Sequence, residues 1–186
     1  RADKVHIKIF SDNIVLSSPI GKMGLENAAY LTIVLSALVQ ESLLHYGVLS
    51  RGGIAQGDFF SDKVMVWGNA LVQAYNLECG VAIYPRIVIH PDLIGALGYH
   101  RRKENAWDEL TDWIAQDQDG LCNVDYINTK YMRDPVTLLT IFIGDSIKRQ
   151  ADHLENIKVI QKMIWHGNYL KNKLAELDDV DDAETT

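Results

Sequence analysis

The feature that most constrains this chain is a long apolar run between Leu25 and Tyr46. Within it, Thr32, Ser36 and Gln40 recur every four residues and form a narrow polar stripe on an otherwise apolar cylinder. This spacing is typical of an α-helix, and a helix that is apolar on most of its circumference is buried in the folded protein. The segment therefore predicts a largely buried helix over about 25–46 that packs against a sheet.

The residues before this helix alternate in the manner of a strand. Val5, Ile7 and Ile9 have a period of two, a Ser-Asp-Asn sequence interrupts the pattern, and apolar residues resume at Ile14. Such alternation marks a half-buried strand, and Asp and Asn tolerate the backbone angles of a tight turn. We expect a hairpin with Asp12 at its tip.

The rest of the chain predicts a mixture of short strands and helices. Segments 48–57 and 63–67 predict a second hairpin joined around 58–62, followed by a helix over about 69–78 and a strand over 83–89. Helical patterns follow over 107–114, 135–149 and about 154–174. The sequence therefore predicts one α+β domain, with a core over 1–100, a helical C-terminal extension over 101–175 and a frayed acidic tail over 176–186.

Charge and composition limit the partners of this chain. The 186 residues carry a formal charge of −7, but six of the 25 acidic residues lie in the last eleven positions, and the other 19 nearly balance the 18 basic ones. A near-neutral body lacks the basic footprint of a nucleic-acid-binding protein, whereas a small anionic ligand remains compatible with it. Cys79 and Cys122 lie far apart, and no run approaches the roughly 18 apolar residues of a membrane span. We expect a cytoplasmic protein with no membrane or nucleic-acid partner.

Three positions are candidates for binding on spacing alone. A carboxylate at a hairpin tip, such as Asp12, can hold a hard divalent cation, although spacing alone favours an Asp that simply forms the turn. Lys8 precedes Asp12 by four residues, which in an extended strand places both side chains on one face, roughly 13 Å apart. Arg51 precedes Gly52 and Gly53, and paired glycines in a strand indicate either a bulge or the close approach of a ligand or another backbone. Arg51 itself can bind phosphate or form a surface ion pair.

The order of these segments resembles the class III nucleotidyl cyclase domain. Lys8-Ile9-Phe10-Ser11-Asp12 has the Lys and Asp of the family's K-x-x-G-D hairpin, and the segment from Met65 to Glu78 echoes its D-x-W-G-N-x-x-N-x-A-x-R-[LM]-E. In this alignment the purine-reading Asp corresponds to Met65, the transition-state Asn to Val72 and the triphosphate-binding Arg to Asn76. A site that hydrogen-bonds its substrate rejects analogues by roughly 10⁴-fold, so a thioether at Met65 disfavours purine readout.

A narrower resemblance covers nearly the whole chain. The segments FSDNIVLSSP, RGGIAQGD, GNALVQAYNLE, YPRIVI and DGLCNVDYI, with a later MIWHGNY, are similar to the pyrimidine cyclases of the Pycsar antiphage system. This resemblance implies a class III cyclase-like (ferredoxin-like) antiparallel sheet with helices on one face, a homodimer, and synthesis of cyclic UMP or cyclic CMP. The cyclic nucleotide would then activate a separate effector protein.

The resemblance also implies a set of site residues. Two Mn²⁺ or Mg²⁺ ions would be held by Asp12 and by a second Asp upstream of Arg1, because the family begins with a strand that carries that residue. Lys8, Arg51, Met65 and Asn76 would face the substrate, UTP in preference to CTP. Two alternatives stay open: a degenerate cyclase-homology domain that only binds nucleotide or dimerises, and an unrelated ferredoxin-like binding module.

Overall fold

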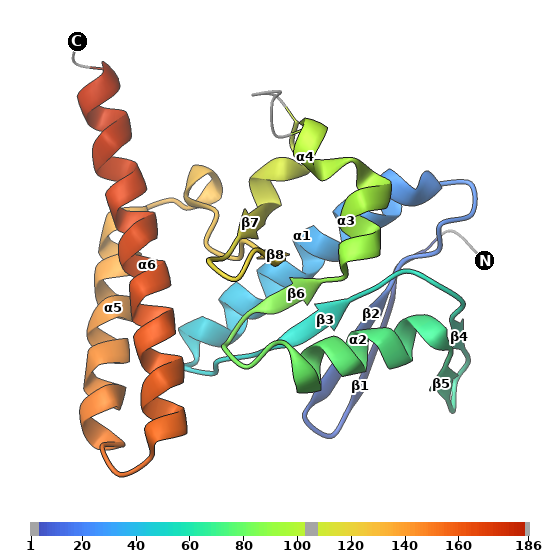
Figure 1. Cartoon of the computed structure of the whole chain (residues 1–186), viewed down its shortest axis with the longest axis horizontal. Helices are drawn as coiled ribbons and strands as arrows, with labels where there is room; N and C mark the ends of the chain where they lie inside the picture. Colours follow the sequence, from blue (N-terminus) through green and yellow to red (C-terminus); the bar gives the residue numbers. More distant parts are fainter. Residues whose placement is uncertain (1–3, 103–107, 185–186) are drawn as a thin grey trace. The chain divides into compact units, whose positions relative to one another are not determined.

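The structure is a computed structural model that describes residues 4–102 and 108–184. It divides into two compact units, the first formed by residues 1–82 and 86–126, the second by residues 83–85 and 127–186. Each unit combines its own helices with the loops or strands that they cover (Figure 1). The prediction of an α+β protein is confirmed.

The predicted N-terminal hairpin is present. β1 (His6–Phe10) pairs antiparallel with β2 (Asn13–Ser17), and Phe10 lies opposite Asn13, which leaves Ser11 and Asp12 as a two-residue turn. Ser11 has a φ of 54°, as such tight turns require. The register places Ile7 opposite Leu16 and Ile9 opposite Ile14, so that one face of the hairpin is entirely aliphatic.

Helix α1 (Gly24–His45) also matches its prediction, but its polar stripe lies on the buried side. Ser36 and Gln40 are both buried, and the Gln40 amide donates to the Ser50 carbonyl at 3.1 Å. Leu38, on another face, is exposed. Among the described residues α1 is the one helix long and apolar enough to cross a membrane, a test that core helices of soluble proteins also pass.

The main sheet is mixed and not antiparallel, which corrects the predicted topology. Its order is β3 (Gly52–Ile54), β6 (Ile87–Ile89), β8 (Cys122–Val124) and β7 (Ile114–Gln116), and β3 and β6 run parallel. They do so because α2 (Asn69–Gly80) carries the chain back across the sheet between them, as parallel neighbours require. Hairpin β1–β2 forms a separate two-stranded sheet (Figure 1).

The second predicted hairpin has different partners from those expected. Segment 63–67 does not pair with 48–57; instead β5 (Val66–Trp67) pairs with β4 (Phe60–Ser61), which lies inside the expected connection. The Phe60 and Trp67 side chains lie directly opposite each other with ring centroids 5.7 Å apart. The aromatic pair therefore sets this register, while β3 is left to pair with β6.

Gly53 permits a close approach of α2 to β3. A Cβ atom at this position would overlap the Ala74 carbonyl oxygen and lie 2.6 Å from the Leu77 Cβ. Of the two explanations for the paired glycines, the close approach of another backbone therefore applies to Gly53. A Cβ at Gly52 would meet its nearest neighbour, on Ile87, at an ordinary 3.5 Å.

The segment after β6 forms short elements. They are α3 (Pro91–Leu97), α4 (Tyr99–Arg102) and the 3-10 helices η1 (Thr111–Trp113) and η2 (Thr129–Tyr131). The helix predicted over 107–114 is wrong: Trp107 lies outside the described residues, η1 is a single turn, and Ile114 already begins β7. The apolar spacing there reflects burial of η1 and of a strand end, not an amphipathic helix.

The second unit is built around a helical hairpin. α5 (Pro135–Asp152) packs along α6 (Ile157–Glu184), and a Cβ at Gly167 would meet Ser146 Oγ at an ordinary contact distance of 3.4 Å. α6 continues beyond the expected end near Leu174, so the acidic segment up to Glu184 is helical and not frayed.

Three aromatic rings stack within the second unit. Trp165 of α6 lies between Tyr84 and Tyr169, with centroid separations of 5.6 and 5.7 Å and interplanar angles of 4° and 2°. The Tyr169 hydroxyl also accepts a hydrogen bond from the Ile127 amide at 3.1 Å. This stack attaches the Ile83–Pro85 segment to α6, because offset parallel rings pack favourably beyond the area they bury.

We predict that Gly53→Ala destabilises the protein by about 1–3 kcal/mol, since the added methyl must displace the backbone of α2. Urea unfolding followed by circular dichroism measures this change. The matched control is Gly52→Ala, whose methyl has room, and we expect it to cost clearly less. Equal losses in the two variants would contradict the close packing described above.

We predict that the free energy of unfolding decreases as the pH is lowered, because of His166, a buried residue of α6. Burial, aided by the charge of Arg149, lowers the pKa of His166 from 6.5 to about 4. Between about pH 6.5 and pH 4, His166 is therefore protonated in the unfolded chain but neutral in the folded chain. Stability is lost as the pH falls through that window. Urea midpoints at pH 7.0 and 5.5 measure the effect.

The comparison uses two substitutions. His166→Gln should reduce the loss of stability between these two pH values, whereas His153→Gln, at an exposed position, should leave it unchanged. If the wild type and His166→Gln lose equal stability over this interval, His166 is not the responsible group.

Candidate functional site

Asp12 lies at the tip of hairpin β1–β2, as the sequence predicts, and is exposed. Its Oδ1 accepts a hydrogen bond from the Asn13 side chain at 3.2 Å. The prediction that Lys8 and Asp12 share a strand face is wrong, because β1 ends at Phe10 and Asp12 belongs to the turn. The carboxylate offers one oxygen-based ligand to a hard cation.

Lys8 and Met65 are brought together from distant parts of the chain. The Lys8 Nζ donates to the Met65 carbonyl oxygen at 3.3 Å, which joins strand β1 to the turn of hairpin β4–β5. The Met65 side chain is 52% exposed. The ammonium group that sequence reasoning assigned to a triphosphate therefore has a backbone partner in this structure.

Asp62 organises the turn that carries Met65. Its Oδ1 accepts from the backbone N–H groups of Val64 at 2.7 Å and of Met65 at 2.8 Å. These hydrogen bonds, that from Met65 first, lower the pKa of Asp62, and the nearby Lys8 charge lowers it further. Sequence reasoning treated this residue only as part of a connection. An Asp at the first position of a short connection was the signal for it, because Asp side chains commonly bind backbone N–H groups two and three residues later.

Arg51 lies beside the C-terminal end of α2, directly before β3. Its Nη2 forms an ion pair with Glu78 Oε1 at 3.5 Å, and its Nη1 donates to the Ala82 carbonyl at 3.5 Å. Of the two roles left open by the sequence, the structure contains the ion pair. Both side chains are partly exposed, so the pair contributes modestly to stability.

The two α2 positions that align with polar residues of the cyclase family lie on one exposed face. Val72 and Asn76 share this face with Tyr75 and Cys79, at the helical spacing of three and four residues. The turn before α2 depends on Gly68, which has a φ of 141° and whose missing Cβ would lie 2.8 Å from the Phe59 Cα. The glycine of the Trp-Gly-Asn sequence is thus explained by backbone geometry.

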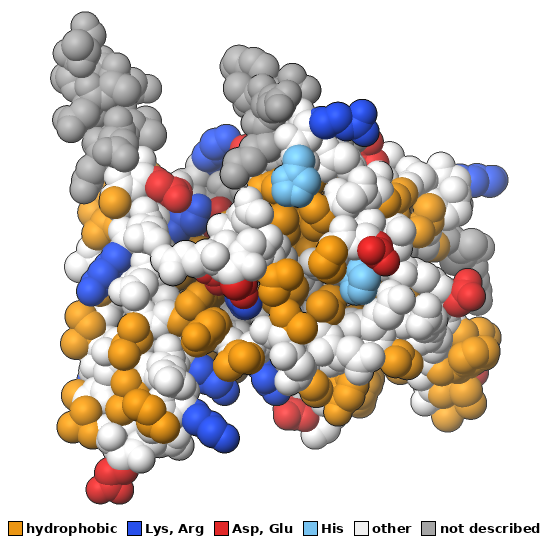
Figure 2. Space-filling view, in the orientation of Figure 1, with side chains coloured by type: hydrophobic (Ala, Val, Ile, Leu, Met, Phe, Trp, Pro, Cys, Tyr) orange, Lys and Arg blue, Asp and Glu red, His pale blue; other side chains and the backbone are white. Residues whose placement is uncertain are grey.

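Apolar side chains gather on the surface around Met65. Figure 2 shows them over hairpin β4–β5, where Phe60, Val64, Met65 and Trp67 are all exposed. A cluster of this kind on a protein surface marks an interaction or ligand-binding region more often than isolated apolar residues do. Asp12 and Asn76 are exposed as well, whereas Arg51 is engaged at the far end of α2.

Few side chains at this site could bind a metal ion. Among the residues whose side chains the structure describes, there is no group of three or more His, Cys, Asp or Glu side chains arranged to hold a metal ion. Asp12 fits as a single ligand of a Mg²⁺ or Mn²⁺ ion that keeps most of its waters. A centre with two ions needs at least one further carboxylate.

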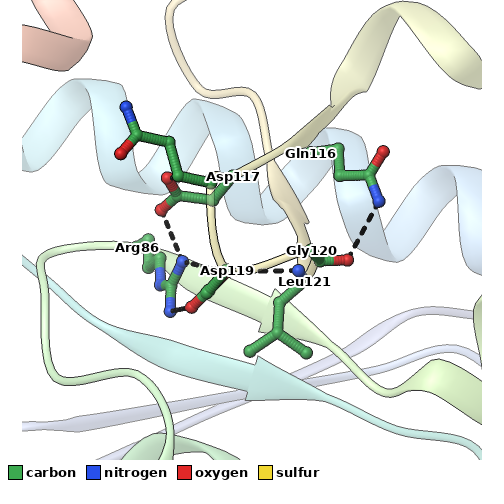
Figure 3. Close-up of polar contacts among 7 residues, drawn as sticks. Arg86, Gln116, Asp117, Asp119, Gly120 and Leu121 are labelled. Atoms are coloured by element: carbon green, nitrogen blue, oxygen red, sulfur yellow. Dashed lines mark hydrogen bonds and ion pairs between the residues drawn. The ribbon is translucent and has the colours of Figure 1, made fainter.

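A second polar centre, which sequence reasoning missed, surrounds Arg86. This buried guanidinium, immediately before β6, forms ion pairs with Asp117 and Asp119 in the turn between β7 and β8 (Figure 3). A further hydrogen bond joins Nη1 to Asp119 Oδ1 at 3.2 Å. The arginine inside the apolar segment YPRIVI was the sequence signal, because a buried charge requires partners.

These ion pairs explain the acidic Asp117–Gly120 segment. The Asp119 carboxylate also accepts from the Leu121 amide, and the hydrogen bond from Arg86 is the main cause of the lowered pKa of Asp119. A carboxyl group whose pKa is lowered by folding stabilises the protein at pH values above its ordinary pKa. This stabilisation is lost as the pH falls through the pKa of the folded state. The centre therefore holds the β7–β8 turn against β6.

Comparison of the chain with models of protein families, with curated proteins and with solved structures found no match in any of the three.

We predict that the double substitution Asp117→Asn with Asp119→Asn destabilises the protein by roughly 3–5 kcal/mol, because it leaves a buried guanidinium without a counter-charge. Urea unfolding at pH 7 measures the loss. The control is Asp145→Asn, an exposed carboxylate on α5, which should change stability by less than about 0.5 kcal/mol. A double variant as stable as this control would contradict a structural role for the centre.

Proposed function

We propose that this protein is a pyrimidine nucleotide cyclase that converts UTP to 3′,5′-cyclic UMP and pyrophosphate. The observation that carries the proposal is the contact between Lys8 and Met65. These residues belong to the two segments on which the resemblance to class III cyclases rests, and they lie 57 positions apart in the chain. A fold that joins those segments supports a shared site.

The proposal assigns a role to each side chain. Asp12 holds a divalent ion, and Met65 lies beside the base, where a thioether cannot hydrogen-bond a purine edge. Asn76 and Arg51 are assigned to bind the triphosphate, as the resemblance implies. Arg51 would first have to break its ion pair with Glu78. Cytidylate cyclase activity uses the same roles and differs only in the atoms that meet the base.

The proposal places one metal ligand, Asp12, among the described residues, where no group of three or more potential ligands is found. We assign the second ligand to an Asp upstream of Arg1. Divalent ions in such enzymes lower the pKa of an attacking hydroxyl and neutralise phosphate charge. Beyond this, the residues of the chain act by orienting the nucleotide and by keeping a purine from binding productively.

The remaining parts of the proposal concern partners and location. The enzyme would act as a cytoplasmic homodimer, and its cyclic product would activate a separate effector during antiphage defence. The exposed apolar cluster at hairpin β4–β5 supports an interface or ligand region near Met65.

A second candidate is a cyclase-homology domain that binds nucleotide or dimerises without catalysis. It is favoured by Val72 and Asn76, which replace two polar family positions on the exposed face of α2, and by the pairing of Arg51 with Glu78. This candidate predicts nucleotide binding without turnover, so the same assay separates the two.

We predict that the protein, extended to include the segment upstream of Arg1, forms cyclic UMP from UTP in the presence of Mn²⁺, with less product from CTP and none from ATP or GTP. Chromatography of the four reactions measures this. Asp12→Asn should lower the rate at least 10²-fold, because it weakens metal binding without altering the turn.

Asn13→Ala is the matched control, since it removes the side-chain partner of Asp12 but no charge. It should retain most of the activity. Absence of cyclic product from all four nucleotides would refute the enzyme, and full activity of Asp12→Asn would refute the metal role.

A further inference from the structure

The contact of Lys8 joins two hairpins that share no strand pairing. In the described part of the chain, β1–β2 and β4–β5 are each two-stranded sheets with no third strand. Two-stranded sheets are marginally stable alone and depend on contacts with their surroundings. No strand pairing links the two hairpins, and the Lys8 hydrogen bond is a contact that joins them directly.

The acceptor of Lys8 is itself held in place. The Met65 carbonyl oxygen also accepts a hydrogen bond from the Asp62 amide at 3.1 Å, while Asp62 binds the amides of Val64 and Met65 through its carboxylate. The turn from Asp62 to Met65 is thus closed by hydrogen bonds from both ends. A cation beside such a turn meets a fixed carbonyl and a nearby carboxylate at once.

Lys8 is also well placed on its own strand. It lies opposite Val15 in the hairpin and is two residues before the end of β1, close to the Ser11–Asp12 turn. Its side chain is partly buried, whereas Ile7 and Ile9 on either side are 57% and 72% exposed. Lys8 is thus the one partly buried residue of β1, and its ammonium group reaches the turn of hairpin β4–β5.

We propose that Lys8 is a positioning residue that fixes the Asp12 tip relative to the turn carrying Met65, and not a direct ligand of the nucleotide. Its effect on catalysis rests on the proposed function, whereas its effect on the two hairpins does not. Removing the ammonium group loosens the β4–β5 hairpin and lets the metal-binding and base-contacting residues move apart. A guanidinium at the same position can still donate to the Met65 carbonyl.

Hydrogen–deuterium exchange of the whole chain tests the structural part. Lys8→Met keeps the apolar stem and removes the donor, and we expect amides 60–67 to exchange several-fold faster in this variant. Lys8→Arg should restore the wild-type rate. Lys63→Met, which removes a positive charge from the same turn, is the control and should leave the exchange unchanged. Unchanged exchange in Lys8→Met, or an equal increase in Lys63→Met, overturns the proposal.

Steady-state kinetics with UTP tests the functional part. A positioning role predicts that Lys8→Met lowers kcat about 10-fold or more and that Lys8→Arg restores both kcat and the exchange rate. A raised KM with unchanged kcat and unchanged exchange would mean that Lys8 binds the nucleotide directly, which overturns the proposal. If the wild type makes no cyclic nucleotide, the proposed function fails while the exchange experiment still decides the role of Lys8.

Discussion

The close contact between α2 and β3 at Gly53 is the constraint on which the first unit depends. It brings the helix backbone onto the strand, and this allows the chain to return and place β6 beside β3 in parallel. Leu77 and Val88 become part of one buried cluster through this arrangement. The same contact determines where the ends of α2 lie, and with them the Gly68 turn and the ion pair of Arg51 with Glu78.

The first unit thus combines a packed centre with loosely attached outer parts. β6 and β8 are largely buried, and the Arg86 centre fastens the β7–β8 turn to them. Hairpins β1–β2 and β4–β5 lie outside this sheet, and both carry exposed apolar side chains. The candidate site residues Asp12, Lys8 and Met65 belong to these outer hairpins. Binding residues commonly lie on the outer parts of a protein, where a packed scaffold positions them.

Local patterns were sufficient to predict some elements and insufficient for others. The four-residue spacing of α1 and the turn at Asp12 depend on neighbouring residues, so both were predicted correctly. The pairing of β3 with β6 depends on residues that are far apart in sequence, and the pattern of residues 48–57 does not indicate which strand pairs with them. Lys8 was assigned to the site from its spacing, but its contact with Met65 depends on how two hairpins meet. The polar stripe of α1 could also be recognised in the sequence. That this stripe is buried could not, because it depends on the hydrogen bond between Gln40 and the Ser50 carbonyl.

The position of Lys8 in β1 has one more consequence, which concerns association between copies of the chain. The aliphatic face formed by Ile7, Ile9, Ile14 and Leu16 would favour antiparallel pairing of two β1 edges. The register that places Ile7 opposite Ile9 of the second copy also places the two Lys8 ammonium groups opposite each other, and their repulsion disfavours it. The residue that joins two hairpins within the molecule therefore also disfavours this pairing of β1 edges between two copies.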